Sequence, residues 1–442
     1  MYDGMVDTIL PDIGGDEAAA EYFRKATDNL GYRMGLYSNY TLLSSVGSGE
    51  TTLDRMTLNS DCDTRYGSGG SKMCKYAYML DIQRRVNAEL KRKFKLTCTY
   101  PDQYTCRAPW AFTDSDVRVP EAGKFSPALR VLAKSLIIER QDFAVPLSEG
   151  IMQWPLAGFC DSYAQNGSPD DPLFPEFQLR KIQPLSNDCG QHLRLTFSGD
   201  KKQIDRYMAL SFGNGTIGHL FGAVGGSAKR RMAVPQETLK SYYLFKQTQK
   251  HYAGVPVKSI EYHLDGKLLT AAEIIAAKAV NNNQLKIVYS NGMEVYVNAN
   301  AKKDYTFKVD SKTVTLPPYG YYLSLPGKVE TASIWKDGHR ADYSFGDEYI
   351  YVNGNGVATS FGAVKCANAY ALLFENNAVE IIPVPFAKAE TILIDLSKLP
   401  IKSAKKLVTL DVNGNEIKSM PVSGNKLEIK VDGKAFSYKI TQ

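Results

Sequence analysis

The sequence lacks the motifs that would place it in several well-defined functional classes. No run of about 18 apolar residues occurs, which excludes a membrane-spanning helix. The seven cysteines form neither a CxxC pair nor a cysteine–histidine cluster of the zinc type. No GxGxxG or GxxxxGK(S/T) follows an expected strand, and GxSxG and HExxH are absent. Dinucleotide, P-loop, serine-hydrolase and zinc-protease chemistries are therefore excluded, and we expect neither a metal nor a cofactor.

Concentrated positive charge is also missing. The net charge is +6 over 442 residues, and the densest basic runs, at 91–95 and 229–231, are short. Such runs are typical of solvated helix ends rather than of a nucleic-acid-binding surface. We therefore expect no nucleic-acid partner.

The first residues lack the charged start and apolar core of a secretion signal.

The chain is long enough for more than one hydrophobic core, at 44% hydrophobic content. Its 27 tyrosines provide many flat rings, which stack on sugars or nucleobases but also fill cores. Because the cysteine count is odd, at least one thiol has no partner within the chain. Cys98 and Cys106 flank one turn and are candidates for a bridge, although Cys98 also fits the role of a small buried hydrophobe.

The first half alternates strand and helix patterns. Acidic residues before an apolar period and glycine after it predict a helix at 16–30, and helical spacing predicts others at 75–93, 125–141 and 235–252. Six strand–helix units predict an α/β fold with a parallel sheet over 1–254. A closed (β/α)8 barrel needs eight units. We expect the first two to lie upstream of Met1; units hidden in long loops, or an open sheet, are the alternatives.

The second half has a different pattern. Alternating apolar and polar runs are separated by turn signals, of which Asn291-Gly292 is the strongest. This predicts all-β structure, with a β-sandwich over 255–385 and a small β-module over 386–442.

Two carboxylates follow expected strands of the parallel sheet. Asp102 follows a strand at 95–100 and Glu149 follows a strand at 143–147, and the helix between them makes the strands parallel neighbours. Adjacent strands lie about 4.8 Å apart, and glycosidic cleavage uses two carboxyl groups about 5 to 9.5 Å apart. Alternatively, Asp102 holds its turn through backbone hydrogen bonds, and Glu149 binds a sugar hydroxyl or pairs with Arg118.

Several segments carry a family resemblance. Residues 33–41, 110–123, 148–150 and 157–163 resemble large bacterial (β/α)8-barrel glycoside hydrolases. They are most similar to polysaccharide-degrading enzymes distantly akin to glycoside hydrolase family 101, the endo-α-N-acetylgalactosaminidases. The resemblance covers about residues 1 to 250 and implies a retaining reaction in which Asp102 is the nucleophile and Glu149 the acid/base.

Further residues near the expected strand ends are candidates for substrate contact. Tryptophan and tyrosine rings offer stacking faces for pyranoses, and carboxylates, amides and imidazoles bind hydroxyls. Asp161 and Asp188 are also the reserve candidates for the second carboxylate, and a salt-bridged structural loop is the alternative for residues 114–118. These candidates are Tyr37, Asn39, Tyr104, Trp110, Asp114, Asp116, Arg118, Trp154, Asp161, Tyr163, Asp188 and His192.

Together these patterns predict a glycoside hydrolase acting on a polysaccharide or glycan. Its partner would be a carbohydrate, and we expect export from a bacterial cell through a signal upstream of Met1. The competing hypothesis is a non-catalytic carbohydrate-binding protein on a degenerate glycosidase barrel.

Overall fold

The chain divides into two compact units, which are described separately. The structure is a computed structural model that describes residues 15–43, 52–65, 71–150, 154–165, 172–179, 187–191, 201–218, 236–384, 389–401 and 403–442. Unit 1 comprises 1–167, 183–192 and 227–229, and unit 2 the remainder. No helix in these ranges combines the length and apolarity needed to cross a membrane.

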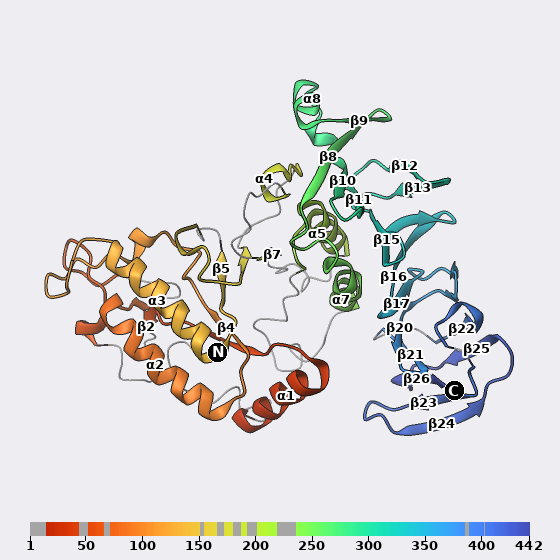
Figure 1. The fold of residues 1–442 in the computed structure, drawn as a ribbon, viewed down its shortest axis with the longest axis horizontal. Coiled ribbons are helices and arrows are strands. Elements are labelled where there is room, and N and C mark those ends of the chain that lie inside the picture. The colour runs from red at the N-terminus through yellow and green to blue at the C-terminus, as the bar shows by residue number, and fades with distance from the viewer. Residues whose placement is uncertain are drawn as a thin grey trace. The chain divides into compact units, whose positions relative to one another are not determined.

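Unit 1 alternates helices with short parallel strands (Figure 1). The elements of its parallel layer are α1 (Gly15–Leu30), β1 (Gly35–Ser38), α2 (Tyr76–Lys93), β4 (Cys98–Pro101), α3 (Ser126–Phe143), β5 (Leu147–Gly150), β6 (Ser162–Gln165) and β7 (Asn187–Gln191). Its smaller elements are β2 (Leu42–Leu43), η2 (Leu53–Arg55), β3 (Lys72–Met73), η4 (Pro109–Phe112) and η5 (Trp154–Leu156).

The parallel strands follow one another across the sheet in chain order. β1 pairs with β4, β5 with β6 and β6 with β7, and a parallel bridge between Thr99 and Pro146 joins β4 to β5. The expected α/β class with a parallel sheet is therefore confirmed for this unit. The described part of the chain does not show the eight-strand closure of a barrel, so the barrel stays a prediction.

Helices α2 and α3 lie side by side and cover one face of these strands (Figure 1). On α2 the residues at helical spacing, Met79, Ile82, Val86 and Leu90, are buried, and their charged neighbours face solvent. Both helices contribute to a core that also includes Phe94. The apolar period of the sequence therefore determines which face of each helix packs on the sheet.

One strand boundary differs from the expectation. Residues 143–147 were expected to form a strand, but Phe143 ends α3, and β5 begins at Leu147. Leu132, Leu136 and Phe143 continue the buried face of the helix, and Ala144 then leaves it with a φ of 70°. Glu149 therefore lies within β5 and not after it.

Unit 2 consists mainly of antiparallel strands. Its helical elements are α4 (Glu176–Leu179), α5 (Lys201–Asn214), α7 (Gln236–Gln249), α8 (Ala271–Ala276), η7 (Val280–Asn282) and η8 (Leu396–Lys398). Its strands are β8 (Val257–Leu264), β9 (Lys267–Leu269), β10 (Gln284–Tyr289), β11 (Glu294–Asn298), β12 (Tyr305–Val309), β13 (Lys312–Leu316), β14 (Tyr321–Leu325), β15 (Val329–Lys336), β16 (His339–Gly346), β17 (Tyr349–Asn353), β18 (Thr359–Phe361), β19 (Val364–Cys366), β20 (Ala369–Glu375), β21 (Ala378–Pro383), β22 (Glu390–Asp395), β23 (Lys406–Leu410), β24 (Glu416–Pro421), β25 (Lys426–Val431) and β26 (Ser437–Thr441).

A thirteen-stranded sheet organises this unit, with a different layer on each face. Because successive side chains of a strand point to opposite faces of the sheet, Tyr321 lies in a core that contains α5 and α7, and Tyr322 lies in a second core. The second core is shared with the β12–β13 hairpin and with a four-stranded sheet of order β18-β19-β22-β25. The prediction of all-β structure after residue 254 is confirmed except for short helices such as α8.

The expected domain boundaries do not coincide with these contacts. Helices α5 and α7 were assigned to the first domain, but they pack on β11, β15 and β16 of unit 2. The boundary at 385 does not separate two sheets, because β26 pairs with β21. The three domain ranges themselves stay predictions.

Buried charges attach both helices to the large sheet. Lys240 of α7 lies 3.0 Å from Asp205 of α5 and 2.9 Å from Asp342 of β16, and Arg340 lies 2.7 Å from Asp205. Burial acts to raise the pKa of Asp342, but Lys240 and Arg340 together hold it below its usual range. The Asp342 carboxylate is thus kept ionised by two cations, as a buried charge requires.

We expect Lys240→Met to lower the free energy of unfolding by about 3 kcal/mol, because two buried carboxylates lose a cation. Urea denaturation measures the loss. The control is Lys406→Met, because its pair with Glu416 is solvent-exposed and contributes at most about 1 kcal/mol. Equal losses in the two variants would contradict this role for Lys240.

Candidate active site

The strand register places three polar residues side by side. Ser38 pairs with Pro101 on one side of β4, and Thr99 pairs with Pro146 on the other. Equal steps along each strand then bring Asn39, Asp102 and Glu149 to one level at the carboxyl ends of β1, β4 and β5. The Ser148 hydroxyl supports this register by donating to the Pro101 carbonyl at 2.6 Å.

These three residues lie on the face of the strands opposite to the helices. Leu36 packs in the helix-side core, and the Thr99 hydroxyl faces Glu139 of α3. Because side chains alternate along a strand, Tyr37 and Tyr100 lie on the other face. Asp102 is on that face as well, since its carboxylate contacts both Tyr37 and Asn39.

Asp102 is held by hydrogen bonds from β1. Tyr37 donates its hydroxyl to Asp102 Oδ2 at 2.5 Å, and Asn39 Nδ2 donates to the same oxygen at 3.3 Å. The Asn39 amide is itself oriented, because its Oδ1 accepts from the Thr41 backbone and hydroxyl at 3.0 and 2.8 Å. The next residue, Gln103, has a φ of 66° and directs its backbone N–H to the carboxylate. The carboxylate is therefore fixed from two sides.

The second carboxyl group changes the protonation of the first. Burial raises the pKa of Asp102 to about 6; the Tyr37 hydrogen bond opposes this rise, and the adjacent Glu149 carboxyl group adds to it. The two carboxyl groups lie close enough for the charge of one to act on the protonation of the other. Such a pair retains one proton at a pH at which an isolated aspartate is ionised.

Glu149 is surrounded by residues of the loop after β4. Thr105 donates its hydroxyl to the Glu149 carbonyl oxygen, and the Cys106 thiol faces the Glu149 carboxyl group. Burial raises the pKa of that thiol, and Glu149 raises it further. Cys106 is therefore a neutral thiol beside the carboxyl group. The loop after β4 thus supports both carboxyl groups.

Some neighbours of the pair were not identified from the sequence. Tyr100 stacks on Tyr37 with ring centroids 6.0 Å apart and an interplanar angle of 22°. Its position two residues before Asp102 was a usable signal, since i and i+2 share a strand face. Gln103 and Cys106 offered no such signal, because their contacts depend on the turn that follows β4. Cys98 and Cys106 are both free thiols.

The structure corrects the role that was expected for Tyr104. It was expected to contact substrate, but it is 1% exposed, and its hydroxyl lies 2.9 Å from the Ser135 hydroxyl of α3. A ring inside the core has no free face for a sugar. Tyr104 therefore anchors the loop after β4 to α3, and its expected sugar contact is wrong.

The residues at 114–118 hold a loop together. The buried Asp114 accepts hydrogen bonds from the Leu58 and Asp116 backbone. Asp116 pairs with the buried Lys75 at 2.5 Å and with Arg118 at 2.7 Å, and these cations hold its pKa well below the usual range. Asp114 and Asp116 are buried, so we assign them structural roles in place of the expected substrate contact. Arg118 pairs with Asp116, whereas the sequence left a pairing with Glu149 open.

Asp161 lies at the wrong end of its strand. It precedes β6, donates its N–H to the Pro146 carbonyl, and lies 3.1 Å from Arg140 at the end of α3. This position is three residues, or about 10 Å, before the level of Glu149. The reserve role of Asp161 as a second carboxylate is therefore wrong.

For three other candidates, Tyr163, Asp188 and His192, the structure gives at most the position of the backbone. The backbone register pairs Tyr163 with Ser148 and with Asp188, which places both residues next to the level of Glu149. Their roles in substrate binding stay predictions. His192 lies outside the described residues.

Two tryptophans present their rings to solvent on loops that follow the carboxyl ends of β4 and β5. Trp110 in η4 is 55% exposed and Trp154 in η5 is 65% exposed. Exposed indole rings suit stacking on a sugar, so both stay candidates for substrate contact.

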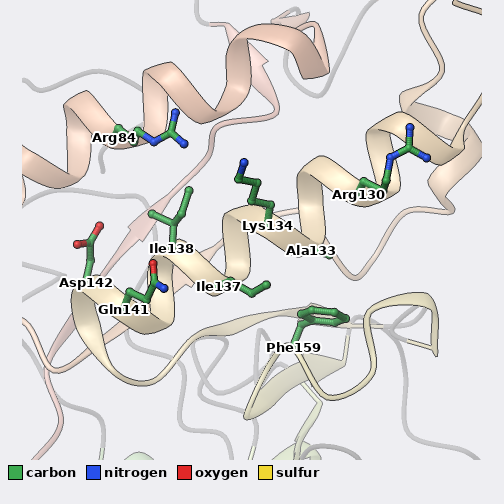
Figure 2. Close-up of a pocket in the computed structure, with 9 residues that line it drawn as sticks. All are labelled: Arg84, Arg130, Ala133, Lys134, Ile137, Ile138, Gln141, Asp142 and Phe159. Carbon is green, nitrogen blue, oxygen red and sulfur yellow. The ribbon is translucent and has the colours of Figure 1, made fainter. Parts of the chain in front are cut away.

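A separate hollow of about 750 Å³ lies on the outer side of α3 (Figure 2). Arg84 of α2, Lys134 and Ile137 of α3, and Phe159 are among its lining residues. It is on the helix side of the strands, whereas Asp102 and Glu149 face the other side, so it is not part of the candidate site. No group of three or more possible metal ligands occurs in the described ranges.

Comparison with known proteins gives only distant similarities. No family model matches the chain, and no curated protein matches it. The ligand-free α-N-acetylgalactosaminidase NagBb from Bifidobacterium bifidum superposes with a TM-score of 0.43 at 14% identity, over 67% of this chain and 46% of that one. The α-L-fucosidase isoenzyme 2 from Paenibacillus thiaminolyticus has a TM-score of 0.33 at 11% identity, over 95% and 89%.

An α-galactosidase from Geobacillus stearothermophilus has a TM-score of 0.37 at 12% identity, over 81% of this chain and 46% of that one. This chain therefore spans less than half of the length of NagBb and of the α-galactosidase. The solved structures named here are glycoside hydrolases, and identities and TM-scores this low assign the chain to no family. The resemblance to family 101 stays a prediction.

We expect Tyr37→Phe to raise the pKa of Asp102 above about 6, because the variant loses the hydrogen bond that favours the ionised carboxylate. Titration of the ¹³C-labelled aspartate carboxyl signals by NMR measures the change. Tyr22→Phe, at an exposed ring of α1, is the matched control. An Asp102 pKa that is equal or lower in Tyr37→Phe would contradict this assignment.

Proposed function

We propose that this chain is a glycoside hydrolase and that Asp102 and Glu149 carry its reaction. The observation that supports this proposal is the pairing of two carboxyl groups at the carboxyl ends of adjacent parallel strands. Hydrolysis of a glycoside needs one group that protonates the leaving oxygen and one carboxylate that attacks the anomeric carbon or activates water. A carboxyl pair that holds a single proton provides both.

The environment of Asp102 supplies the asymmetry that this chemistry needs. Burial raises the pKa of Asp102 to about 6, so the pair keeps a proton under mildly acidic conditions, and the reaction needs that proton on the partner group while Asp102 is ionised. Tyr37 and Asn39 donate to the carboxylate and limit its rotation. Preoriented donors of this kind lower the reorganisation needed during the reaction.

Within the pair we propose Asp102 as the nucleophile and Glu149 as the acid/base of a retaining reaction. Retaining pairs lie about 5 to 5.5 Å apart with the sugar between them. The Glu149 carboxyl group acts directly on that of Asp102 here, so a bound sugar, which lies between the two groups, has to move them apart. The side chain of Glu149 is the one that moves in this proposal, because Asp102 is held by both Tyr37 and Asn39.

The rings around the pair fit a carbohydrate substrate. Tyr37 and Tyr100 form a stacked, partly exposed wall beside Asp102, and the exposed Trp110 and Trp154 lie on the loops that follow β4 and β5. Pyranose rings stack on such surfaces. We propose that the substrate is a glycan or polysaccharide and that the protein is exported from the cell.

Hydrolysis of aryl glycosides distinguishes the two roles. We expect Asp102→Asn to lose about 10³-fold or more in kcat on every aryl glycoside that the protein cleaves, because no group attacks the sugar. Glu149→Gln should lose less on p-nitrophenyl glycosides than on purified glycans, because p-nitrophenolate leaves without protonation. Release of nitrophenol and of reducing ends measures both.

The matched control is Asp161→Asn, directly before the neighbouring strand β6, which should change kcat less than about twofold because this residue lies away from the pair. If both pair variants bind glycans and the wild-type protein hydrolyses none of a full panel, the protein is the non-catalytic carbohydrate-binding alternative. If Asp102→Asn keeps wild-type kcat, the proposed nucleophile is wrong.

We also expect kcat/KM to fall as the pH rises through about 6. The pair is active with one proton, and the raised pKa of Asp102 marks the loss of that proton in the free protein. A pH series on one aryl glycoside measures the profile. A kcat/KM that is constant or increases between pH 5 and 8 would contradict a single shared proton.

A further inference from the structure

A buried glutamate lies behind the candidate site, on the helix side of the strands. Glu139 of α3 is fully buried, and its Oε1 accepts hydrogen bonds from Gln83 Nε2 at 2.6 Å and Asn87 Nδ2 at 3.1 Å, both on α2. Among the described residues, its second oxygen has no hydrogen-bond partner. A carboxyl group that is fully buried and incompletely bonded destabilises the fold. Its presence at this position therefore points to a role other than stabilisation.

The contacts of Glu139 lead to both residues that define the site. Asn87 accepts a hydrogen bond from the Tyr40 hydroxyl at 2.8 Å, and Tyr40 directly follows Asn39. On the other side, the Thr99 side chain of β4 faces Glu139, and Thr99 lies three residues before Asp102. Asn39 and Asp102 then contact each other on the opposite face. The contacts form a closed circuit around the ends of β1 and β4.

We propose that Glu139 is a positioning residue for Asp102, because it fixes from the helix side the strand ends that carry Asn39 and Asp102. Its effect on catalysis rests on the function proposed above, whereas its effect on the Asp102 carboxylate does not. A misplacement of about 1 Å at a reacting group lowers rates by up to about 10²-fold. A rigid support behind the strands therefore has a measurable consequence.

The surroundings of Glu139 favour its neutral form. Burial raises the pKa of Glu139; hydrogen bonds from Thr99, Gln83 and Asn87 oppose the rise, and Asp142 adds to it. Asp142 is itself paired with Lys91 at 2.8 Å, and the hydroxyls of Tyr40 and Tyr104 also face Glu139. When the pKa of a carboxyl group is higher in the folded than in the unfolded state, the protein loses stability as the pH rises. The loss starts near the ordinary pKa of the group and continues through its pKa in the folded state.

Glutamine in place of Glu139 keeps the shape of the side chain and is always neutral. Alanine in its place removes the contacts with α2 and β4. We expect Glu139→Gln to keep kcat within about threefold of wild type and to reduce the fall in the free energy of unfolding between pH 5 and 8. Glu139→Ala should lower kcat about tenfold to a hundredfold with little change in KM, and should shift the pKa of Asp102. Urea denaturation at each pH, aryl glycoside kinetics and carboxyl NMR measure these effects.

Tyr76→Phe is the matched control, because it removes a partly buried hydrogen bond of α2, from Tyr76 to the Pro120 carbonyl, outside the circuit. It should lose stability with an unchanged kcat and Asp102 pKa. A folded Glu139→Ala that keeps the wild-type Asp102 titration would overturn the proposal, as would an unchanged pH dependence of unfolding in Glu139→Gln. If the wild-type protein cleaves no glycoside, the proposed function fails, and the Asp102 titration in Glu139→Ala still decides the role of Glu139.

Discussion

The contact between the Asp102 and Glu149 carboxyl groups is the interaction on which the account of this protein depends. It exists because β4 and β5 are parallel, adjacent and in register, so that two acidic side chains end at the same level. Water solvates these groups incompletely, and their charges repel. In the proposed reaction the pair retains one proton, so that an acid lies beside a base. The hydrogen bond from Tyr37 favours the ionised form of Asp102 and opposes the effect of burial.

Local patterns in the sequence predicted most elements of the parallel layer of unit 1, but not β6 (Ser162–Gln165). Helical spacing on α2, acidic residues at the start of α1 and the alternation of strands with helices predicted the parallel layer. The sequence was less informative at Phe143, where one apolar residue fits both the end of a helix and the start of a strand. It was also less informative for α5 and α7, because their packing on the large sheet depends on Asp205, Lys240 and Asp342, which are far apart in the chain.

The candidate site was predictable to the extent that it follows strand geometry. Asp102 and Glu149 were found because each carboxylate follows an apolar run, and Tyr37 and Asn39 because they lie at the end of β1. Tyr104, Asp114 and Asp116 were candidates for substrate contact because they lie in the loop after an expected strand, with a salt-bridged structural loop as the alternative for the two aspartates. In the structure this loop folds back onto α2 and α3, and the buried Lys75 accounts for Asp116. Burial of a loop requires contacts between distant residues, which periodicity does not reveal.

A carboxyl NMR titration of Asp102 in wild-type protein and in Glu149→Gln tests the central contact most directly. If the two carboxyl groups share one proton, removal of the Glu149 charge lowers the pKa of Asp102 from about 6, because only burial then raises it. An Asp102 pKa that is the same in both proteins would show that the carboxyl groups do not interact, and would contradict the account.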